Sequence, residues 1–116
     1  MSRSWSLYLD DILGACQNIF TYTDRITYED FLADNKTRDA VIHNIGIIGE
    51  AIKQLPDAVR QKAPGVEWRN ISRMRDRIVH TYFGLDYQIV WDTAQNHVPT
   101  LLAAVTSIRE QGGGDG

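Results

Sequence analysis

The chain has 116 residues, is 43% apolar and carries a formal net charge of −3, with a pI of about 5.5. This length predicts a single domain with one hydrophobic core. The chain contains no run of about 18 apolar residues, which excludes a membrane span, and its start lacks the apolar segment of a secretory signal. A general nucleic-acid binder is usually basic, so the acidic net charge counts against broad, charge-driven RNA binding but not against a local basic site. The lone Cys16 excludes an internal disulfide and fits a reducing cytoplasm.

Apolar residues recur every three or four positions in the first half of the chain, a pattern that predicts amphipathic helices. The first stripe is Leu9, Ile12, Leu13, Cys16, Ile19 and Phe20. The second stripe is Val41, Ile45, Ile48, Ile52 and Leu55. Between them, Thr27 and Asp30 are typical of a capping box at the start of a short helix. Gly46 and Gly49 lie inside the second helix, where we expect them to let another helix approach closely.

A break at Ala63-Pro64-Gly65 precedes a third helix, predicted from about Trp68 to Tyr82 and ended by Gly84. Asp86 is a candidate cap for the last helix. The stripe of that helix is Val90, Ala94, Val98, Leu101, Val105 and Ile108.

Pro99 lies inside this last stripe and predicts a kink. No strand-like alternation is evident, so the sequence predicts an all-α antiparallel bundle of four main helices plus short ones. We expect one helical domain over residues 1–111 and a flexible glycine-rich tail over residues 112–116.

Four residues of the third predicted helix form the only plausible catalytic set: Arg75, Asp76, His80 and Tyr82. Arginine can pair bidentately with phosphate oxygens and offset developing charge. Histidine can move a proton near neutral pH, as a base toward a ribose 2′-hydroxyl or as an acid toward the leaving oxygen. Asp76 can hold the imidazole or orient an arginine, and Tyr82 offers a hydroxyl at the edge of the site. The set suggests phosphodiester cleavage without a metal.

Helical geometry limits how these residues can meet. At about 100° per residue, Arg75 and Tyr82 project within about 20° of each other, whereas Arg75 and His80 are about 140° apart. One straight helix therefore does not aim both groups at one phosphate. A second copy of the helix across a two-fold axis can supply the missing group. We therefore expect the working site to form at the interface of a homodimer.

Three further arginines, Arg69, Arg73 and Arg77, surround the motif and are candidate RNA-binding residues. A solvated, salt-bridged helix face can hold the same charges, and clustering alone does not separate the two interpretations. Cys16 is expected to be a buried small hydrophobe, and His43 and His97 are expected to be structural or surface residues. No spacing of Cys, His, Asp or Glu resembles a metal site, and no cofactor is expected.

At these residues the sequence resembles the HepT-like toxins, a branch of the HEPN superfamily. The motif Arg75-x4-His80-x-Tyr82 matches the family signature. The resemblance extends to Arg38-Asp39-Ala40-Val41, Ile47-Ile48-Gly49-Glu50-Ala51, Trp68-Arg69-Asn70-Ile71, Arg77 through Phe83, and Asp86 followed by Ile89-Val90-Trp91. These segments span roughly residues 5–110.

The resemblance implies an α-helical homodimer with a metal-independent ribonuclease site in the dimer cleft. Arg75 and His80 would be the catalytic pair, and Asp76 would fill the polar position after the arginine. It also implies a type VII toxin–antitoxin system, in which an MntA-like nucleotidyltransferase antitoxin attaches AMP to Tyr82. Glu50 is expected either to face the site or to pair with an arginine such as Arg38.

Two other functions fit the same residues. One is a non-catalytic helical dimer that binds and regulates a nucleotidyltransferase. The other is an RNA-binding module that uses the basic cluster without cleaving RNA, whose binding would be sensitive to salt.

Overall fold

The structure, a computed structural model, describes residues 4–80 and 86–111, with residues 79 and 80 described by their backbone alone. Its elements are α1 (Trp5–Thr23), α2 (Tyr28–Ala33), α3 (Asn35–Gln54), α4 (Asp57–Arg60), α5 (Trp68–His80), α6 (Tyr87–Asp92), the π-helical turn η1 (Thr93–His97) and α7 (Val98–Glu110). Every regular element in these ranges is helical, which confirms the predicted all-α class.

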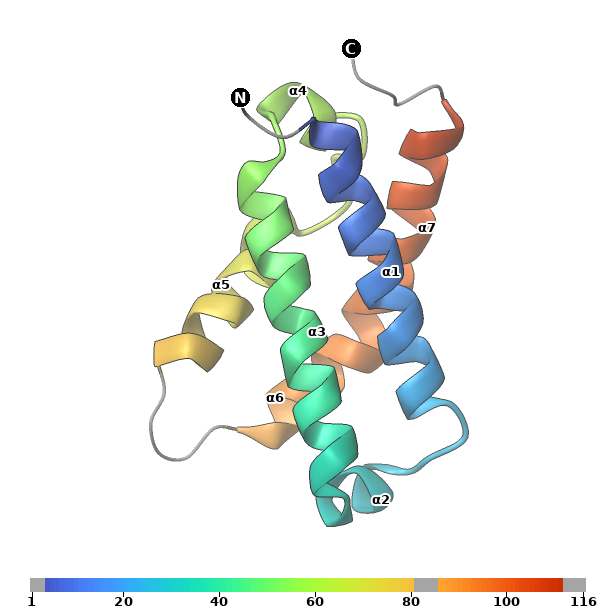
Figure 1. Ribbon diagram of the computed structural model, residues 1–116, viewed down its shortest axis with the longest axis vertical. Coiled ribbons are helices and arrows are strands. Elements are labelled where there is room, and N and C mark those ends of the chain that lie inside the picture. Colours follow the sequence, from blue (N-terminus) through green and yellow to red (C-terminus); the bar gives the residue numbers. More distant parts are fainter. Residues whose placement is uncertain (1–3, 81–85, 112–116) are drawn as a thin grey trace.

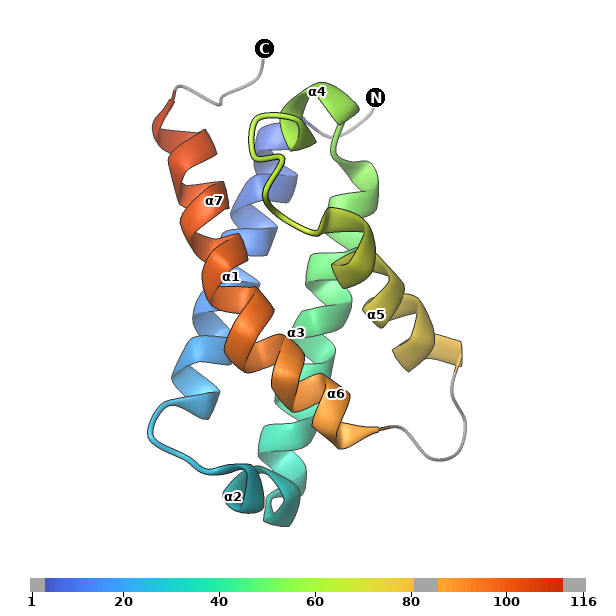
Figure 2. The ribbon, with the colours of Figure 1, turned by 180° about the vertical axis from the view of Figure 1, so that it is seen from behind.

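The four main helical segments are α1, α3, α5 and the continuous run from α6 through η1 to α7. They follow one another in alternating directions, so the predicted antiparallel bundle is confirmed (Figures 1 and 2). Helix α3 is central because it packs against α1 on one side and α5 on the other, while α7 packs against α1. Short α2 closes one end of the bundle, and α4 lies at the other end (Figure 1). The two-fold dimer stays a prediction.

Side-chain caps fix where several helices begin. Thr27 and Asp30 form the predicted capping box at α2, with each side chain accepting from the other's backbone N–H. Asp34 accepts from the N–H groups of Lys36 and Thr37 at the start of α3. Asp86 caps α6 as predicted, by accepting from two backbone N–H groups of the first turn. These caps satisfy N–H groups that have no partner inside a helix.

The predicted apolar stripes form one core. All five residues of the second stripe and all six of the last stripe are buried, as are Leu9, Ile12, Cys16 and Ile19 of the first. Leu13 is partly buried against the core, and Phe20 is the exception, because it is 57% exposed. It lies at the edge of the α1 stripe, only three residues before the helix ends, where no neighbouring helix covers it fully. Its assignment to the buried stripe was therefore wrong.

The last helix is interrupted upstream of Pro99 rather than kinked at that residue. Residues Thr93–His97 form the π-helical turn η1, and Pro99 lies in the first turn of α7. A proline lacks the backbone donor and its ring crowds the carbonyl four residues earlier, which here belongs to Gln95 within η1. The widened turn accommodates that conflict, as π-bulges commonly do.

Two predicted features lie outside the described residues: the stop at Gly84 and the tail over residues 112–116. Across the described ranges, no helix combines the length and apolar character needed to cross a bilayer.

Gly49 marks the point of closest approach between α3 and α5. A Cβ added there would lie 2.2 Å from the Cβ of Arg75 and 2.8 Å from its Cγ, far inside normal contact. The predicted packing role is therefore confirmed for Gly49. It is wrong for Gly46, where an added Cβ would meet nothing within 4 Å. Gly46 lies three residues earlier in α3 and faces open space.

This contrast predicts opposite effects of two Gly→Ala substitutions. Gly49→Ala forces α5 away from α3, and overpacking of this kind costs about 1–3 kcal/mol. Gly46→Ala adds only helix propensity and is expected to be neutral or to stabilise by up to about 1 kcal/mol. Urea unfolding of both variants measures the difference. Equal stability of the two variants would contradict the close approach at Gly49.

Candidate active site

The Arg75 side chain leaves α5 directly over Gly49 of α3, so its stem is fixed where the two helices meet. From there the guanidinium reaches two carboxylates. Its Nη2 lies 3.2 Å from Oε2 of Glu50, on α3. Its Nη1 donates to Oδ1 of Asp76, the next residue in α5, at 3.2 Å. The guanidinium has five N–H donors, so these contacts orient it while leaving donors for a ligand.

A second cation completes the cluster. Lys53 of α3 donates from Nζ to Oδ1 of Asp76 at 2.5 Å, the same oxygen that Arg75 contacts. The Lys53 hydrogen bond, helped by that of Arg75, holds the pKa of the Asp76 carboxyl below its usual value. The four side chains therefore alternate in charge, in the order Glu50, Arg75, Asp76, Lys53. We call these four residues the α3–α5 charge cluster.

The cluster resolves two of the predictions made from the sequence. Asp76 was expected to hold the imidazole or to orient an arginine, and its contact with Arg75 matches the second role. Glu50 faces the site and pairs with Arg75 rather than with Arg38. Arg38 instead donates to the Leu32 carbonyl and the Asn35 side chain.

The catalytic pair is only partly described. His80 is the last residue of α5, and its side chain lies outside the described residues, as does the whole of Tyr82. Their predicted roles as catalytic histidine and modification site therefore stay predictions. The structure does describe the side chain of Arg75, which is 26% exposed and is oriented by its contacts with Glu50 and Asp76.

The structure separates Arg75 from the other three arginines of α5. Arg69, Arg73 and Arg77 are spaced four residues apart, so they share one stripe of α5, and each is exposed. Arg73 and Arg77 line a groove between α5 and the α6–η1 segment. We call this the α5–α6 groove and define it by Asn70, Arg73, Met74 and Arg77 on α5, with Asp92 and His97 opposite.

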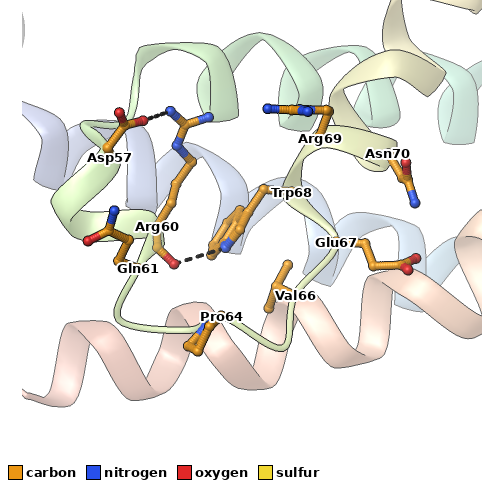
Figure 3. A pocket seen from close by; sticks show the side chains of 9 residues that line it. All are labelled: Asp57, Arg60, Gln61, Pro64, Val66, Glu67, Trp68, Arg69 and Asn70. Atoms are coloured by element: carbon orange, nitrogen blue, oxygen red, sulfur yellow. Dashed lines mark hydrogen bonds and ion pairs between the residues drawn. The ribbon is translucent and has the colours of Figure 1, made fainter.

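Arg69 lines a different cavity, of about 460 Å³, between α4 and the start of α5. Figure 3 shows Arg69 with the other residues that line this cavity, among them Arg60, which is paired with Asp57. The indole Nε1 of Trp68 donates to the carbonyls of Arg60 and Ala63, each at 3.1 Å, and this fixes the wall of the cavity. The three predicted RNA-binding arginines thus divide between two neighbouring hollows.

The remaining candidates behave as expected from the sequence. Cys16 is fully buried, and burial raises the pKa of its thiol to about 12, which makes it a core residue rather than a nucleophile. His43 is exposed on α3. His97 lies at the end of η1, part-exposed, near Asp92 and Glu67. Among the described residues, no three His, Cys, Asp or Glu side chains gather closely enough to hold a metal ion.

Sequence reasoning missed Lys53 entirely. The spacing between Gly49 and Lys53 could have indicated this residue. A side chain four positions after a glycine at a helix contact lies on the same helix face and can reach the same neighbouring helix. That signal needs the identity of the neighbouring helix, which the sequence does not give.

The fold and the cluster together define an all-α antiparallel bundle in which an arginine is held where two long helices meet. The profile of the family described as Ribonuclease HepT-like matches residues 12–108. A protein of Thermococcus cleftensis named "Probable ribonuclease HepT" is 41% identical over 110 residues, covering 95% of this chain and 100% of that protein. One of Methanocaldococcus jannaschii named "Putative RNase MJ0127" is 41% identical over 101 residues, covering 87% and 84%. No solved structure gives a significant match. The chain belongs to the HepT-like ribonuclease family.

The shared Asp76 oxygen generates a prediction about Lys53. In Lys53→Met the largest cause of the depressed pKa disappears, so the Asp76 pKa should rise toward the ordinary value of about 3.9. A depressed carboxyl pKa stabilises the fold at pH values above the unfolded-state pKa, and this stabilisation is lost as pH falls through the folded-state pKa. The stability difference between the two proteins should therefore be present near neutral pH and vanish in acid.

A carboxyl ¹³C NMR titration measures the shift and carries its own control. Hydrogen bonds from Thr37 hold the pKa of Asp34 below its usual value, and these bonds are untouched by the substitution. Asp34 should titrate unchanged in Lys53→Met. An Asp76 pKa that stays fixed, or an Asp34 pKa that moves equally, would contradict the contact.

Proposed function

We propose that the protein is a metal-independent ribonuclease toxin whose active site forms at the cleft of a homodimer. The observation that carries the proposal is the Arg75 guanidinium, held at the α3–α5 contact by Glu50 and Asp76 in a chain of the HepT-like ribonuclease family. Preorganised donors stabilise developing charge because they need no reorganisation during the reaction. Arg75 is such a donor, aimed by residues on two helices.

The proposed reaction is transesterification of RNA. The ribose 2′-oxygen attacks the adjacent phosphorus, forms a new P–O bond and loses its proton to one His80. The bond to the 5′-oxygen breaks, and that oxygen takes a proton from an acid, which leaves a cyclic phosphate and a 5′-hydroxyl. Arg75 binds the phosphate oxygens as charge develops on them. In each of two composite sites, the two-fold dimer brings His80 of one protomer to Arg75 of the other, and the same imidazole can take the 2′-proton and then give it to the 5′-oxygen.

The charge cluster orients Arg75 without giving the site a net charge, because its two cations and two carboxylates balance. Glu50 and Asp76 offset Arg75 and Lys53, so the site does not itself attract RNA strongly. The exposed arginines Arg69, Arg73 and Arg77, on another face of α5, would supply that attraction, in keeping with their proposed role in RNA binding.

The proposed partner is an MntA-like nucleotidyltransferase antitoxin of a type VII system. Tyr82 follows Arg75 by seven residues, so on a continued helix the two would project in nearly the same direction. An AMP joined to Tyr82 through a phosphodiester would place negative charge and bulk beside the phosphate-binding arginine. This would silence the ribonuclease without unfolding it.

Removing His80 should abolish most RNA cleavage. His80→Ala is expected to slow the purified, AMP-free protein by about 10²- to 10⁴-fold, and Arg75→Ala by about 10²- to 10³-fold, with EDTA present throughout. His43→Ala, which removes an exposed histidine of α3, is the matched control and should cleave normally. Cleavage that persists in His80→Ala would overturn the catalytic assignment. An inactive AMP-free wild type would favour the non-catalytic regulator.

The same two variants test the composite site. In a mixed dimer of one Arg75→Ala protomer and one His80→Ala protomer, a site built across the two-fold axis regains one intact Arg75 and His80 pair. Activity should therefore return to about half of the wild-type value. If each site used both groups from one protomer, the mixed dimer would remain inactive.

Modification of Tyr82 is tested by intact mass and peptide mapping after co-expression with the neighbouring nucleotidyltransferase. A mass gain of whole AMP units, mapped to Tyr82 and absent from Tyr82→Phe, is expected. Tyr87, in the first turn of α6, is the internal control and should stay unmodified. An unmodified Tyr82 with an active partner would contradict silencing by AMP.

A further inference from the structure

The α5–α6 groove lies on a different face of α5 from Arg75, and its contents suggest a ligand. Its volume is about 350 Å³, near the lower end of the range of roughly 300–1,000 Å³ typical of small-ligand sites. Its two walls come from segments far apart in the sequence, α5 on one side and α6 with η1 on the other (Figure 2). A groove of this size suits one nucleotide rather than a folded RNA.

The α5 wall carries positive charge. Arg73 and Arg77 are four residues apart, exposed, and on the same stripe of the helix. Asn70, three residues before Arg73, adds an amide to the same wall. Two guanidiniums at this spacing can bind the oxygens of a phosphate through charge-assisted hydrogen bonds.

The floor of the groove is largely apolar. Ile71 and Thr93 are buried there, 4% and 5% exposed, and Met74 and Ile89, which also line the groove, are partly buried. Thr93 directs its hydroxyl to the Ile89 carbonyl, so it presents no unsatisfied donor to the groove. A flat nucleobase can pack on such a surface, because every base has an apolar face.

One end of the groove provides groups for the edge of a base: His97 and Asp92 on the opposite wall, and Glu67, which directly precedes α5. The His97 Nε2 lies 3.7 Å from Oδ2 of Asp92, and its Nδ1 lies 3.9 Å from Oε2 of Glu67. Neither separation is a hydrogen bond, so these contacts leave the imidazole able to bind a ligand. The two carboxylates repel a phosphate and accept hydrogen bonds from base amines. The polarity of the groove thus directs phosphate toward Arg73 and Arg77 and the base edge toward His97, Asp92 and Glu67.

We propose that the α5–α6 groove binds one unpaired nucleotide of a single-stranded RNA. Arg73 and Arg77 hold its phosphate, and the base packs on the Met74 side of the floor. Sequence-specific recognition of RNA mostly uses such splayed-out bases. This proposal depends on the proposed function in one respect only, that the ligand is RNA. It assigns the groove to selecting the RNA, at a site separate from the one that cleaves it.

The larger cavity beside α4 is a weaker candidate. Its Arg60 guanidinium is paired with Asp57 (Figure 3), and the Trp68 N–H in its wall donates to the carbonyls of Arg60 and Ala63. The α5–α6 groove carries Arg73 and Arg77 on α5, Asp92 on the opposite wall and Glu67 just before α5.

Met74 provides a direct readout of the groove. Met74 lines the groove, so its methyl signal in a protein labelled with ¹³C-methyl methionine reports on ligand binding there. The probe is a short 2′-O-methyl oligoribonucleotide, which lacks the free 2′-hydroxyl needed for cleavage. It should shift the Met74 signal, whereas inorganic phosphate at the same concentration should not.

Charge-matched variants separate the groove from general attraction. Arg73→Gln/Arg77→Gln should lower the affinity for the probe at least about tenfold, and the slope of log K against log salt should fall by about 0.7, for one phosphate contact with a single strand. Lys36→Gln/Lys62→Gln removes two exposed charges elsewhere and should stay within about twofold of wild type. All of these residues are exposed, and glutamine keeps helix propensity, so both variants should fold.

Three results would overturn the groove proposal: a Met74 signal that does not respond to the probe, an equal response to inorganic phosphate, or equal losses of affinity in the two double variants. Failure of the proposed ribonuclease function would look different. In that case natural RNA would stay intact with the wild-type protein, while the uncleavable probe still bound in the groove.

Discussion

The contact between Gly49 and Arg75 is the constraint on which the site depends. Only a residue without a Cβ lets α5 approach α3 so closely that the Arg75 stem lies over the α3 backbone. That approach brings Arg75 and Asp76 within reach of Glu50 and Lys53. The helix contact and the charge cluster are therefore one feature, because any change in the separation of the two helices alters the direction of the guanidinium.

Charge balance within the cluster has a consequence for how an anionic substrate is handled. Two cations and two carboxylates alternate in space, so the arginine is oriented without creating a strongly positive patch. Exposed ion pairs of this kind contribute little to stability, which makes orientation their more important effect. We propose that affinity for RNA comes from other residues, for which the exposed arginines elsewhere on α5 are the candidates.

Helix α5 thus presents two sets of arginines on different faces. Arg75 points toward α3, while Arg73 and Arg77, two positions away on either side, line the groove against α6 and η1. A step of two residues rotates a helical side chain by about 200°. The π-helical turn η1 shapes the second wall, since it ends with His97 facing the groove. A chain with an acidic net charge can therefore still present local basic surface.

Much of the fold could be read from the sequence, because apolar periodicity and capping residues are local signals. The buried stripes, the Thr27–Asp30 capping box and the Asp86 cap follow from spacing alone. The failures also have local causes. Phe20 has the right spacing but lies at the edge of the stripe near the end of α1, and the steric conflict of Pro99 is accommodated one turn earlier in η1.

The sequence by itself determined the helical class, the family signature and the identity of Arg75 as the central residue. Only the tertiary structure decided which partners that arginine has. Lys53 and Glu50 are more than 20 residues from the motif, and they meet it because α3 and α5 cross at Gly49. Helical periodicity specifies which face of a helix is buried. It does not specify which face of which neighbour lies opposite, because that follows from how all the helices pack together.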